Sequence, residues 1–410
     1  MPSEGFSGPR PLEGVLVADF SRVLAGPSAA MLLGDLGADV IKVERPGVGD
    51  DTRTWGPPYR GDTSTYFLGT NRGKRSIALD LKDPDDRRIA RKLALRADVL
   101  IENFLPGTLE RSGLGYEQLR VDNPGLVYSS ITGFGSAGGA ERPGYDFIAQ
   151  AVGGLMSITG ESDGQPMKVG VALVDVITGL HATIAILAAL RSRDTTGMGH
   201  HVEVNLLSSL LSALSNQASA YVAGGEVPTR LGNRHPSVAP YQILPTADRS
   251  IAVGCGNDGQ FRALCAALEV PAIADDPRFV TNRDRVANLA ELQVVLEDAS
   301  RTRPSADVLA TLEAARVPCG PVNTIAEAFT LAEELGLDPI QHVALGDDLV
   351  PQVSPPFRFD RRAVSVFGPP PGLGEHTDEV RAWLEADVPL GPGDGPADLA
   401  ADAVQQAAHG

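Results

Sequence analysis

An aspartate between two apolar segments is the residue of this chain best placed to do chemistry. Asp175 follows the short, partly β-branched run 169–174, which predicts a buried or edge strand, and it precedes the apolar run 176–190, which predicts a core helix. Open α/β sheets place reactive groups at the carboxyl ends of strands, and an unpaired buried carboxylate is costly. The local sequence fits two interpretations equally: a catalytic carboxylate, or a helix N-cap that accepts a bond from backbone N–H groups.

Cationic side chains recur near the ends of expected strands in the first part of the chain. They are Arg45, Arg72, Lys74, Arg75, Lys82 and Arg111. Guanidinium and ammonium groups bind phosphate oxygens, so this concentration in an acidic protein suits a phosphate-bearing ligand. The alternative is a set of solvated surface charges, which is the usual state of Lys and Arg.

Two loops offer polar groups to a ligand. Asn103, Phe104 and Leu105 directly follow an expected strand, where an amide beside an aromatic face could hold a flat ring such as adenine. Turns are rich in Asn and Gly in any case, which weakens this signal. Tyr145 follows the glycine-rich loop 133–140 and could bond a substrate oxygen, although a buried tyrosine more often finds a structural acceptor.

The histidines and cysteines do not form the pattern of a metal site. His200 and His201 are adjacent on an expected strand and point to opposite faces, and His181 on an apolar helix is expected to be a satisfied core residue. His235 is the one histidine expected near a site. The three cysteines lack CxxC spacing, and no GxGxxG follows the first expected strand. The sequence therefore predicts no metal and no tightly bound cofactor.

Composition narrows the partners and the compartment. The 410 residues carry a formal net charge of −17, which argues against nucleic acid but not against a small anion bound by local arginines. The odd number of cysteines fits a reducing cytosol. The N-terminus has no apolar segment of a secretory signal, and the apolar stretch within 176–190 is too short to span a membrane. We therefore expect a cytoplasmic protein that does not contact a membrane.

Alternating strand and helix patterns predict a parallel sheet covered by helices, an α/β fold. Strands are expected at 15–20, 39–44, 76–81, 98–102, 126–131 and 200–205. The turn-rich stretch 224–241 reads as a linker into a smaller α+β domain with strands at 241–245 and 250–254, helices within 259–315, and a return strand at 318–323. The expected divisions are 1–224 for the large domain, 225–323 for the small domain, 324–388 for a segment completing the large domain, and 389–410 for a disordered tail.

Taken together, these segments strongly resemble the family III CoA-transferases, the formyl-CoA and carnitine CoA-transferase-like group. The resemblance extends from the N-terminus to about residue 380, and only the combination of segments is specific. The matching segments lie at 19–50, 71–82, 97–117, 129–151 and 170–190, with the shorter motifs RLGNRHPSVAPYQ, GNDGQF, VPCGPVNT and GEHTDEV.

The resemblance implies a Rossmann-like large domain built from both ends of the chain, and an interlocked homodimer. It also implies that Asp175, in a G-x-x-x-x-D-x-x-x-G segment, is the catalytic carboxylate, and that Tyr145 contacts the substrate. The coenzyme A contacts of the family fall on Leu24, Ala25, Arg45, Leu79, Asp80, Lys82, Asn103, Phe104, Leu105 and Arg111.

The implied reaction moves CoA from an acyl-CoA donor to a free carboxylic acid through anhydride and aspartyl-CoA thioester intermediates. Backbone N–H groups of Gly232 and Asn233 are the expected oxyanion donors. Leu24 stands where the formyl-CoA branch has Gln, and the loop at 232–240 lacks that branch's four glycines. Both differences favour succinyl-CoA or another dicarboxylate over oxalate and formyl-CoA.

Two other functions compete with CoA transfer. An α-methylacyl-CoA racemase on the same scaffold needs a histidine at the position of Tyr145, and tyrosine is a poor base at neutral pH. A non-catalytic CoA-binding protein would have lost its nucleophile, whereas Asp175 is present. The sequence therefore favours the transferase.

Overall fold

The computed structural model describes residues 10–345, 348–364 and 368–386, so the tail expected at 389–410 lies outside the described residues. The chain divides into two compact units. Unit 1 comprises Met1–Gly153, Gly170–Ala218 and Asp338–Gly410, and unit 2 comprises Gly154–Val169 and Ser219–Leu337.

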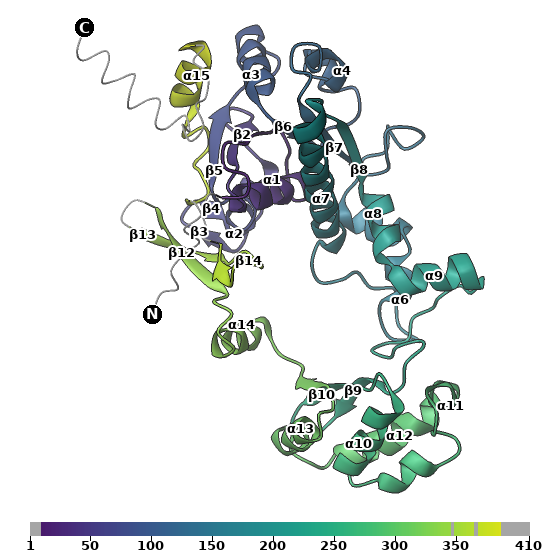
Figure 1. Ribbon diagram of the computed structural model, residues 1–410. Coiled ribbons are helices and arrows are strands. Elements are labelled where there is room, and N and C mark those ends of the chain that lie inside the picture. Colours follow the sequence, from purple (N-terminus) through teal and green to yellow (C-terminus); the bar gives the residue numbers. More distant parts are fainter. Residues whose placement is uncertain (1–9, 346–347, 365–367, 387–410) are drawn as a thin grey trace. The chain divides into compact units, whose positions relative to one another are not determined.

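Unit 1 is built on a six-stranded parallel sheet, which confirms the predicted α/β fold (Figure 1). Apolar side chains on both sides of the central strands make such a sheet stable only when both faces are covered. Val17 of the central strand pairs with Val40 on one side and Val99 on the other. In spatial order the strands are β5 (Lys74–Ala78), β2 (Asp39–Glu44), β1 (Leu16–Asp19), β6 (Val99–Glu102), β7 (Val127–Thr132) and β8 (His201–Asn205).

Helices cover the two faces, and the alternation of side chains along each strand divides the core accordingly. Leu16 and Ala18 belong to the cluster that includes α3 and α15, whereas Val17 belongs to the cluster that includes α1 and α7. Figure 1 shows α15, near the C-terminal end, beside α3, and the two helices are in contact. The four helices are α1 (Ala25–Asp35), α3 (Pro84–Arg96), α7 (Leu173–Thr196) and α15 (Thr377–Ala386).

Shorter elements complete unit 1 around this sheet. They include helical turns after β2 and β6, and hairpins at residues 59–64 and 340–363. Their bounds are η1 (Asp51–Thr54), β3 (Tyr59–Arg60), β4 (Thr63–Ser64), α2 (Thr65–Leu68), η2 (Glu110–Ser112), α4 (Tyr116–Leu119), α5 (Asp146–Val152), α8 (Leu206–Ala213), β12 (Ile340–Leu345), β13 (Asp348–Val353), β14 (Arg358–Phe359) and β15 (Arg362–Ala363).

The strand expected at 169–174 is absent, and this part of the prediction is wrong. Residues 168–172 have no regular structure, and α7 already begins at Leu173. The apolar run has no partner strand, and Val171 is 61% exposed instead of buried in a sheet. Asp175 therefore lies in the first turn of a helix and not at the end of a strand.

Helix α7 is also longer than the apolar stretch from which it was predicted. It has 24 residues, and by length and composition alone it could cross a membrane, a test that the core helix of a soluble protein also passes. Here Ala182 and Ile186 of α7 are buried in the core beside α1. The segment after β8 forms two helices, α8 and α9 (Ser215–Gly224), and Ser215 has a positive φ of 48°.

Unit 2 combines a three-stranded antiparallel sheet with helices around a separate core. The pairing order is β11–β10–β9, and Leu244 and Ile251 are buried against Phe261 and Leu296. Its elements are α6 (Leu155–Ile158), the part of α9 from Ser219 onward, β9 (Tyr241–Pro245), β10 (Ser250–Gly254), α10 (Asp258–Ala267), η3 (Pro271–Asp275), α11 (Asn282–Ala287), α12 (Leu289–Ser300), α13 (Ser305–Ala314), β11 (Cys319–Pro321) and α14 (Ile325–Glu334).

The burial of β1 within the sheet is tested by the same Val→Ala substitution at two positions, one buried and one exposed. Val17 is fully buried, whereas Val121 is 76% exposed. We expect Val17→Ala to lower the free energy of unfolding by about 2–3 kcal/mol, from lost burial plus a cavity. Val121→Ala should change it by less than about 0.5 kcal/mol. Equal losses in urea titrations of the two variants would contradict this placement of β1.

Candidate active site

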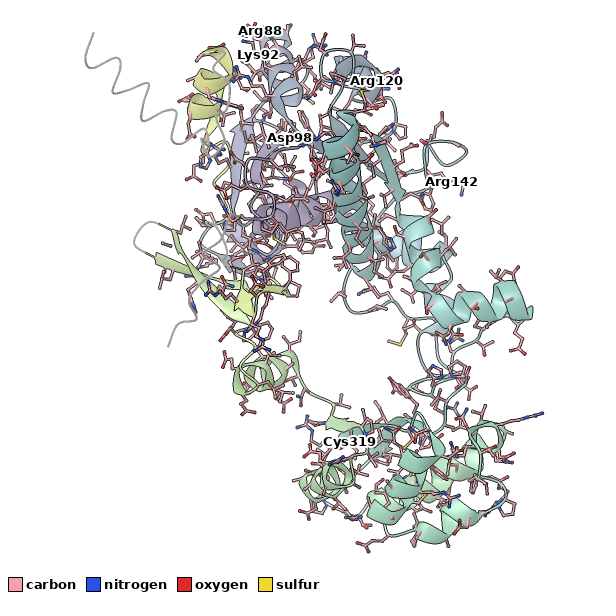
Figure 2. All side chains as sticks on the ribbon, viewed as in Figure 1. Arg88, Lys92, Asp98, Arg120, Arg142 and Cys319 are labelled. Carbon is pink, nitrogen blue, oxygen red and sulfur yellow. The ribbon has the colours of Figure 1, made fainter. Side chains whose placement is uncertain are left out.

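Two adjoining cavities lie in unit 1, and the first contains Asp175. The first has a volume of about 340 Å³ and the second of about 360 Å³. Arg22, Phe104 and Thr108 line both cavities, so the two spaces meet at these side chains. Arg142, on the loop between β7 and α5 (Figure 2), belongs to the lining of the first cavity.

Asp175, Tyr145 and the residues predicted to contact CoA line these two cavities, although their roles remain predictions. Gly232, Asn233 and His235 belong to unit 2 and also remain predictions. The first cavity is lined by Leu24, Ala25, Asn103, Phe104, Leu105, Tyr145 and Asp175. The second is lined by Arg45, Leu79, Asp80, Lys82, Phe104 and Arg111.

Asp175 stands in the first turn of α7 with its carboxylate free of the helix end. The N-cap residue of α7 is Ala172, so the interpretation of Asp175 as an N-cap is wrong. Burial raises the pKa of Asp175 to about 7, and the negative charge of Asp146 adds to this rise. A carboxylate that titrates near neutral pH inside a cavity is typical of a functional group.

The first turn of α7 is capped from another segment of the chain. Asp146, at the start of α5, accepts hydrogen bonds from the backbone N–H of Val174 (2.7 Å) and of Asp175 (3.3 Å). These are two of the N–H groups that a helix start leaves without an internal partner. The aspartate that caps α7 is therefore Asp146.

Tyr66 on α2 is a candidate residue that the sequence analysis missed. Burial, followed by the negative charges of Asp175, Asp146 and Asp50 in that order, raises the pKa of Tyr66 to about 12. Its hydroxyl therefore stays a proton donor near Asp175 at neutral pH. The ring of Trp55 meets that of Tyr66 edge-on at 5.5 Å. No spacing in the sequence connects Tyr66 with Asp175.

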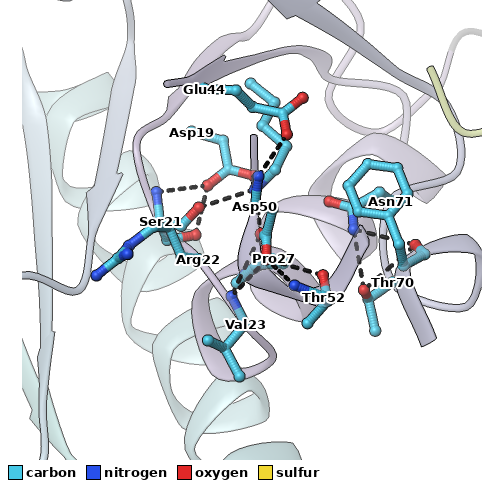
Figure 3. Close-up of polar contacts among 12 residues, drawn as sticks. Asp19, Ser21, Arg22, Val23, Pro27, Glu44, Asp50, Thr52, Thr70 and Asn71 are labelled. Atoms are coloured by element: carbon cyan, nitrogen blue, oxygen red, sulfur yellow. Dashed lines mark hydrogen bonds and ion pairs between the residues drawn. The ribbon is translucent and has the colours of Figure 1, made fainter. Parts of the chain in front are cut away.

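The loop between β1 and α1 forms part of the wall of the first cavity and has a strained conformation. Val23 adopts a positive φ of 72°, which is costly for a β-branched residue. Both carboxylate oxygens of Asp50 accept the Val23 N–H, at 3.2 and 3.3 Å (Figure 3). Thr52 also donates its N–H and its hydroxyl to Asp50. Asp50 thus holds the loop in this conformation.

Two buried lysines compensate the charges beneath this loop. The Lys42 ammonium lies 2.9 Å from Asp50 and donates to the Ser21 carbonyl at 2.8 Å. The Lys74 ammonium donates to Asp19 at 2.8 Å, and all four charged side chains are fully buried. Burial alone would raise the pKa of Asp50, but the charge of Lys42 together with the hydrogen bonds from Thr52 and Lys42 holds that pKa below its usual value. Figure 3 shows Asp19 and Asp50 beside Ser21 and Val23.

The loop after β6 is tied to the loop after β1. The Asn103 side chain accepts the Arg22 N–H at 2.8 Å and donates to the Arg22 carbonyl at 2.7 Å. Glu102 accepts the Phe104 N–H at 2.8 Å, and burial raises the pKa of Glu102 to about 7. Asn103 therefore has a structural role in joining the loops at the point where the cavities meet.

Comparison with known proteins places this fold and site in a family. The family model for CoA-transferase family III matches residues 12–377. The chain belongs to CoA-transferase family III. The predicted family is thereby confirmed, and the substrates of this class of enzyme are CoA thioesters.

Relatives of this CoA-transferase differ in the acids that their names give. The succinate–glutarate CoA-transferase of Agrobacterium fabrum is 45% identical, over 92% of this chain and 96% of its own length. The acetyl-CoA:oxalate CoA-transferase of Acetobacter aceti is also 45% identical, over 79% of this chain and 83% of its own. A crystal structure of a CAIB/BAIF family protein from Brucella suis matches with a TM-score of 0.82 and 44% identity, over 92% of this chain and 100% of that one.

The cations of this CoA-transferase fall into two classes. Lys74, Arg72 and Arg75 form structural ion pairs, and Arg72 in particular binds buried Asp35. The remaining three are exposed on the second cavity: Arg45, Lys82 and Arg111.

The other sequence-based expectations for this CoA-transferase concern histidines and metals. His181 bonds the Ser209 hydroxyl at 3.1 Å, as expected of a satisfied core residue. His200 bonds Ser192 and His201 bonds Ser130, each at 3.0 Å. Within residues 10–345, 348–364 and 368–386, no group of three or more His, Cys, Asp or Glu side chains could hold a metal ion.

Two neighbouring aspartates test the importance of the buried charges. We expect Asp50→Ala to lower the free energy of unfolding by about 3–5 kcal/mol, because Lys42 then keeps a buried charge without its partner at 2.9 Å. Asp51 instead forms a pair with Arg22 at 3.0 Å in which both side chains are more than a third exposed. Asp51→Ala should therefore cost about 0–1 kcal/mol. Similar losses in urea titrations of both variants would show that the Lys42–Asp50 pair is unimportant.

Proposed function

We propose that the Asp175 carboxylate is the nucleophile with which this enzyme moves CoA from an acyl-CoA to a free carboxylic acid. The observation that carries the proposal is the position of this carboxylate. It is partly buried in a cavity, free of the helix end, and its pKa is raised to about 7. A more basic carboxylate is a better nucleophile, provided that it is ionised at the working pH.

The first half of the proposed reaction makes an enzyme thioester. An oxygen of Asp175 attacks the thioester carbonyl of the donor, and the carbon–sulfur bond breaks to release the CoA thiolate and leave a mixed anhydride. The thiolate then attacks the Asp175 carbonyl of this anhydride. The donor acid leaves as a carboxylate that carries one oxygen from Asp175, and CoA stays on the enzyme as an aspartyl thioester.

The second half runs the same steps in reverse with the acceptor. The acceptor carboxylate attacks the aspartyl thioester and expels the thiolate, which forms a second anhydride. The thiolate attacks the acceptor's carbonyl, and the new acyl-CoA leaves. Asp175 is regenerated as a carboxylate that contains one oxygen from the acceptor. No oxidant, reductant or net proton is needed.

The second cavity is the proposed binding site for the nucleotide part of CoA. Phe104 and Leu79 offer apolar surfaces for the adenine ring, and Phe104 also lines the Asp175 cavity. Three exposed cations, Arg45, Lys82 and Arg111, line this cavity and are the proposed partners of the phosphate groups. The junction at Phe104 gives the thioester end of CoA a route toward Asp175.

The proposed donor is succinyl-CoA, with glutarate or another small dicarboxylic acid as acceptor. The name of the Agrobacterium relative supports this choice, and so does Leu24 in place of the glutamine of the formyl-CoA branch. Arg142 supplies positive charge to the first cavity, where a second carboxylate of the substrate needs compensation. Because of the name of the Acetobacter relative, oxalate should also be tested as an acceptor.

A hydrogen bond within unit 2 helps to choose between the two proposed oxyanion donors. The Gly232 N–H already donates to the Gly160 carbonyl at 3.1 Å. The N–H of Asn233 is therefore the better candidate of the two predicted donors. His235 accepts the Ser237 N–H at 3.0 Å through Nδ1, which leaves Nε2 as the ring nitrogen proposed to face substrate.

An interlocked homodimer in the cytoplasm remains part of the proposal. Its support within unit 1 is the apolar surface of α7, where Val176, Leu180 and Ile184 are 39%, 46% and 64% exposed at a spacing of four residues. Such a stripe on a helix that is otherwise in the core is typical of an interface with a second chain.

Removal of the carboxylate tests the proposed nucleophile. Asp175→Ala is expected to lose at least about 10⁴-fold in transfer from succinyl-CoA to glutarate, because covalent catalysis has no substitute at this position. Intact-mass analysis of the wild type with succinyl-CoA alone should show a CoA adduct on the Asp175 peptide. Full activity of the variant would refute the assignment, and α-proton exchange without any adduct would favour the racemase.

Asp175→Asn is the matched control for folding. Because the folded protein raises the pKa of Asp175 from 3.8 to about 7, it binds more protons than the unfolded chain between these values. The wild type therefore loses stability as pH rises through this window, and the asparagine variant does not. We expect Asp175→Asn to melt above the wild type at pH 8 but not at pH 4. An inactive variant with this thermal profile is inactive for chemical reasons.

A further inference from the structure

The start of α7 is unusual because no local side chain caps it. Its N-cap residue, Ala172, has no side-chain acceptor, and the segment before it has no regular structure. The Oδ1 atom of Asp146 instead accepts the N–H groups of Val174 and Asp175, at 2.7 and 3.3 Å. The nucleophile of the proposed reaction is therefore bonded through its own backbone to a second aspartate.

Asp146 is itself held rigidly. It is 9% exposed, and its Oδ2 atom accepts a hydrogen bond of 2.6 Å from Nε2 of Gln150, four residues later on α5. Gln150 is fully buried. Each oxygen of Asp146 thus has a fixed donor, one from α5 and the other from α7, so the carboxylate links the two helix starts.

We propose that Asp146 is the positioning residue of the active site: it caps the first turn of α7 and places a fixed negative charge beside the Asp175 carboxylate. The inference rests on the proposed role of Asp175 as nucleophile. An ordinary cap would need only an oxygen acceptor, which Asn, Ser or Thr also supply. A buried charge next to the nucleophile also changes the pKa of the nucleophile.

The negative charge of Asp146 and the dipole of α7 act on the pKa of Asp175 in opposite directions. The positive end of a helix dipole favours a negative side chain in the first turn and would make Asp175 less basic. Asp146 offsets that effect, and its charge adds to burial in raising the pKa of Asp175 to about 7. The other ionisable groups that face Asp175 or line its cavity are Tyr66, Tyr145, Arg22, Asp51 and Arg142.

Asp146→Asn separates the charge from the hydrogen bonds. Asparagine keeps an oxygen for the two backbone N–H groups, and the amide of Gln150 can rotate to accept from the new NH₂ group. The measurement is the rate of adduct formation with succinyl-CoA from pH 5 to pH 9. At pH 6 the wild type should run at about a tenth of its plateau rate, from the fraction of ionised Asp175. The asparagine variant should run at a clearly larger fraction of its own plateau.

Two further variants distinguish charge from position. Asp146→Glu keeps the charge but moves it by one methylene. The acid limb of its pH–rate profile, which is the rise in rate with pH below the plateau, should therefore coincide with that of the wild type, while its plateau rate falls by about 100-fold. Thr281→Ala removes an ordinary N-cap, that of α11 in unit 2. It should change neither the acid limb nor the plateau rate, and circular dichroism with thermal melting confirms folding of every variant.

The outcomes test the role of Asp146 and the role of Asp175 separately. An acid limb of Asp146→Asn that coincides with the wild type would overturn the inference, because a purely structural cap predicts that result. If Asp146→Asn does not fold, an acid limb of Asp146→Glu displaced from the wild type would overturn it instead. Activity retained by Asp175→Ala would refute the nucleophile itself, whatever the Asp146 variants show.

Discussion

The buried pair between Lys42 and Asp50 is the interaction on which the rest of the site depends. Both side chains are fully buried, so the charge of Asp50 depends on Lys42 and on its hydrogen bonds, and the charge of Lys42 depends on Asp50 and on Asp19, which lies 3.9 Å away. Asp50 holds Val23 in its strained conformation, and Lys42 holds the Ser21 carbonyl. The loop after β1 then takes its place in the Asp175 cavity, and Asn103 ties the next loop to it. A charge pair beneath the sheet edge thereby fixes the wall of both cavities.

The second constraint is the meeting of two carboxylates at the start of α7. Burial and a neighbouring like charge both disfavour ionised Asp175, and the folded protein loses stability through this arrangement at neutral pH. A residue chosen for stability alone would not be an aspartate. Active sites commonly keep such locally unfavourable groups because the chemistry requires them.

The parallel sheet was predictable from the sequence because strand-like segments alternate with helical segments, and several of these strands contain short apolar runs such as 99–101. The apolar run 169–174 has the same composition but no partner strand, and periodicity cannot detect that difference. Asp175 was singled out from the local sequence, and the family resemblance favoured a catalytic role for it, but the strand predicted before it is absent. The roles of Lys42, Asp146 and Tyr66 depend on contacts between distant segments, which one sequence does not reveal.

The central claim is that an oxygen of Asp175 takes part in the reaction, and an isotope measures this directly. Wild-type enzyme charged with succinyl-CoA would receive glutarate whose carboxylates carry ¹⁸O, for a single turnover. The account predicts that the Asp175 peptide gains one ¹⁸O atom, because the regenerated carboxylate keeps an oxygen of the acceptor. Glutaryl-CoA formed without any ¹⁸O on that peptide would contradict the account.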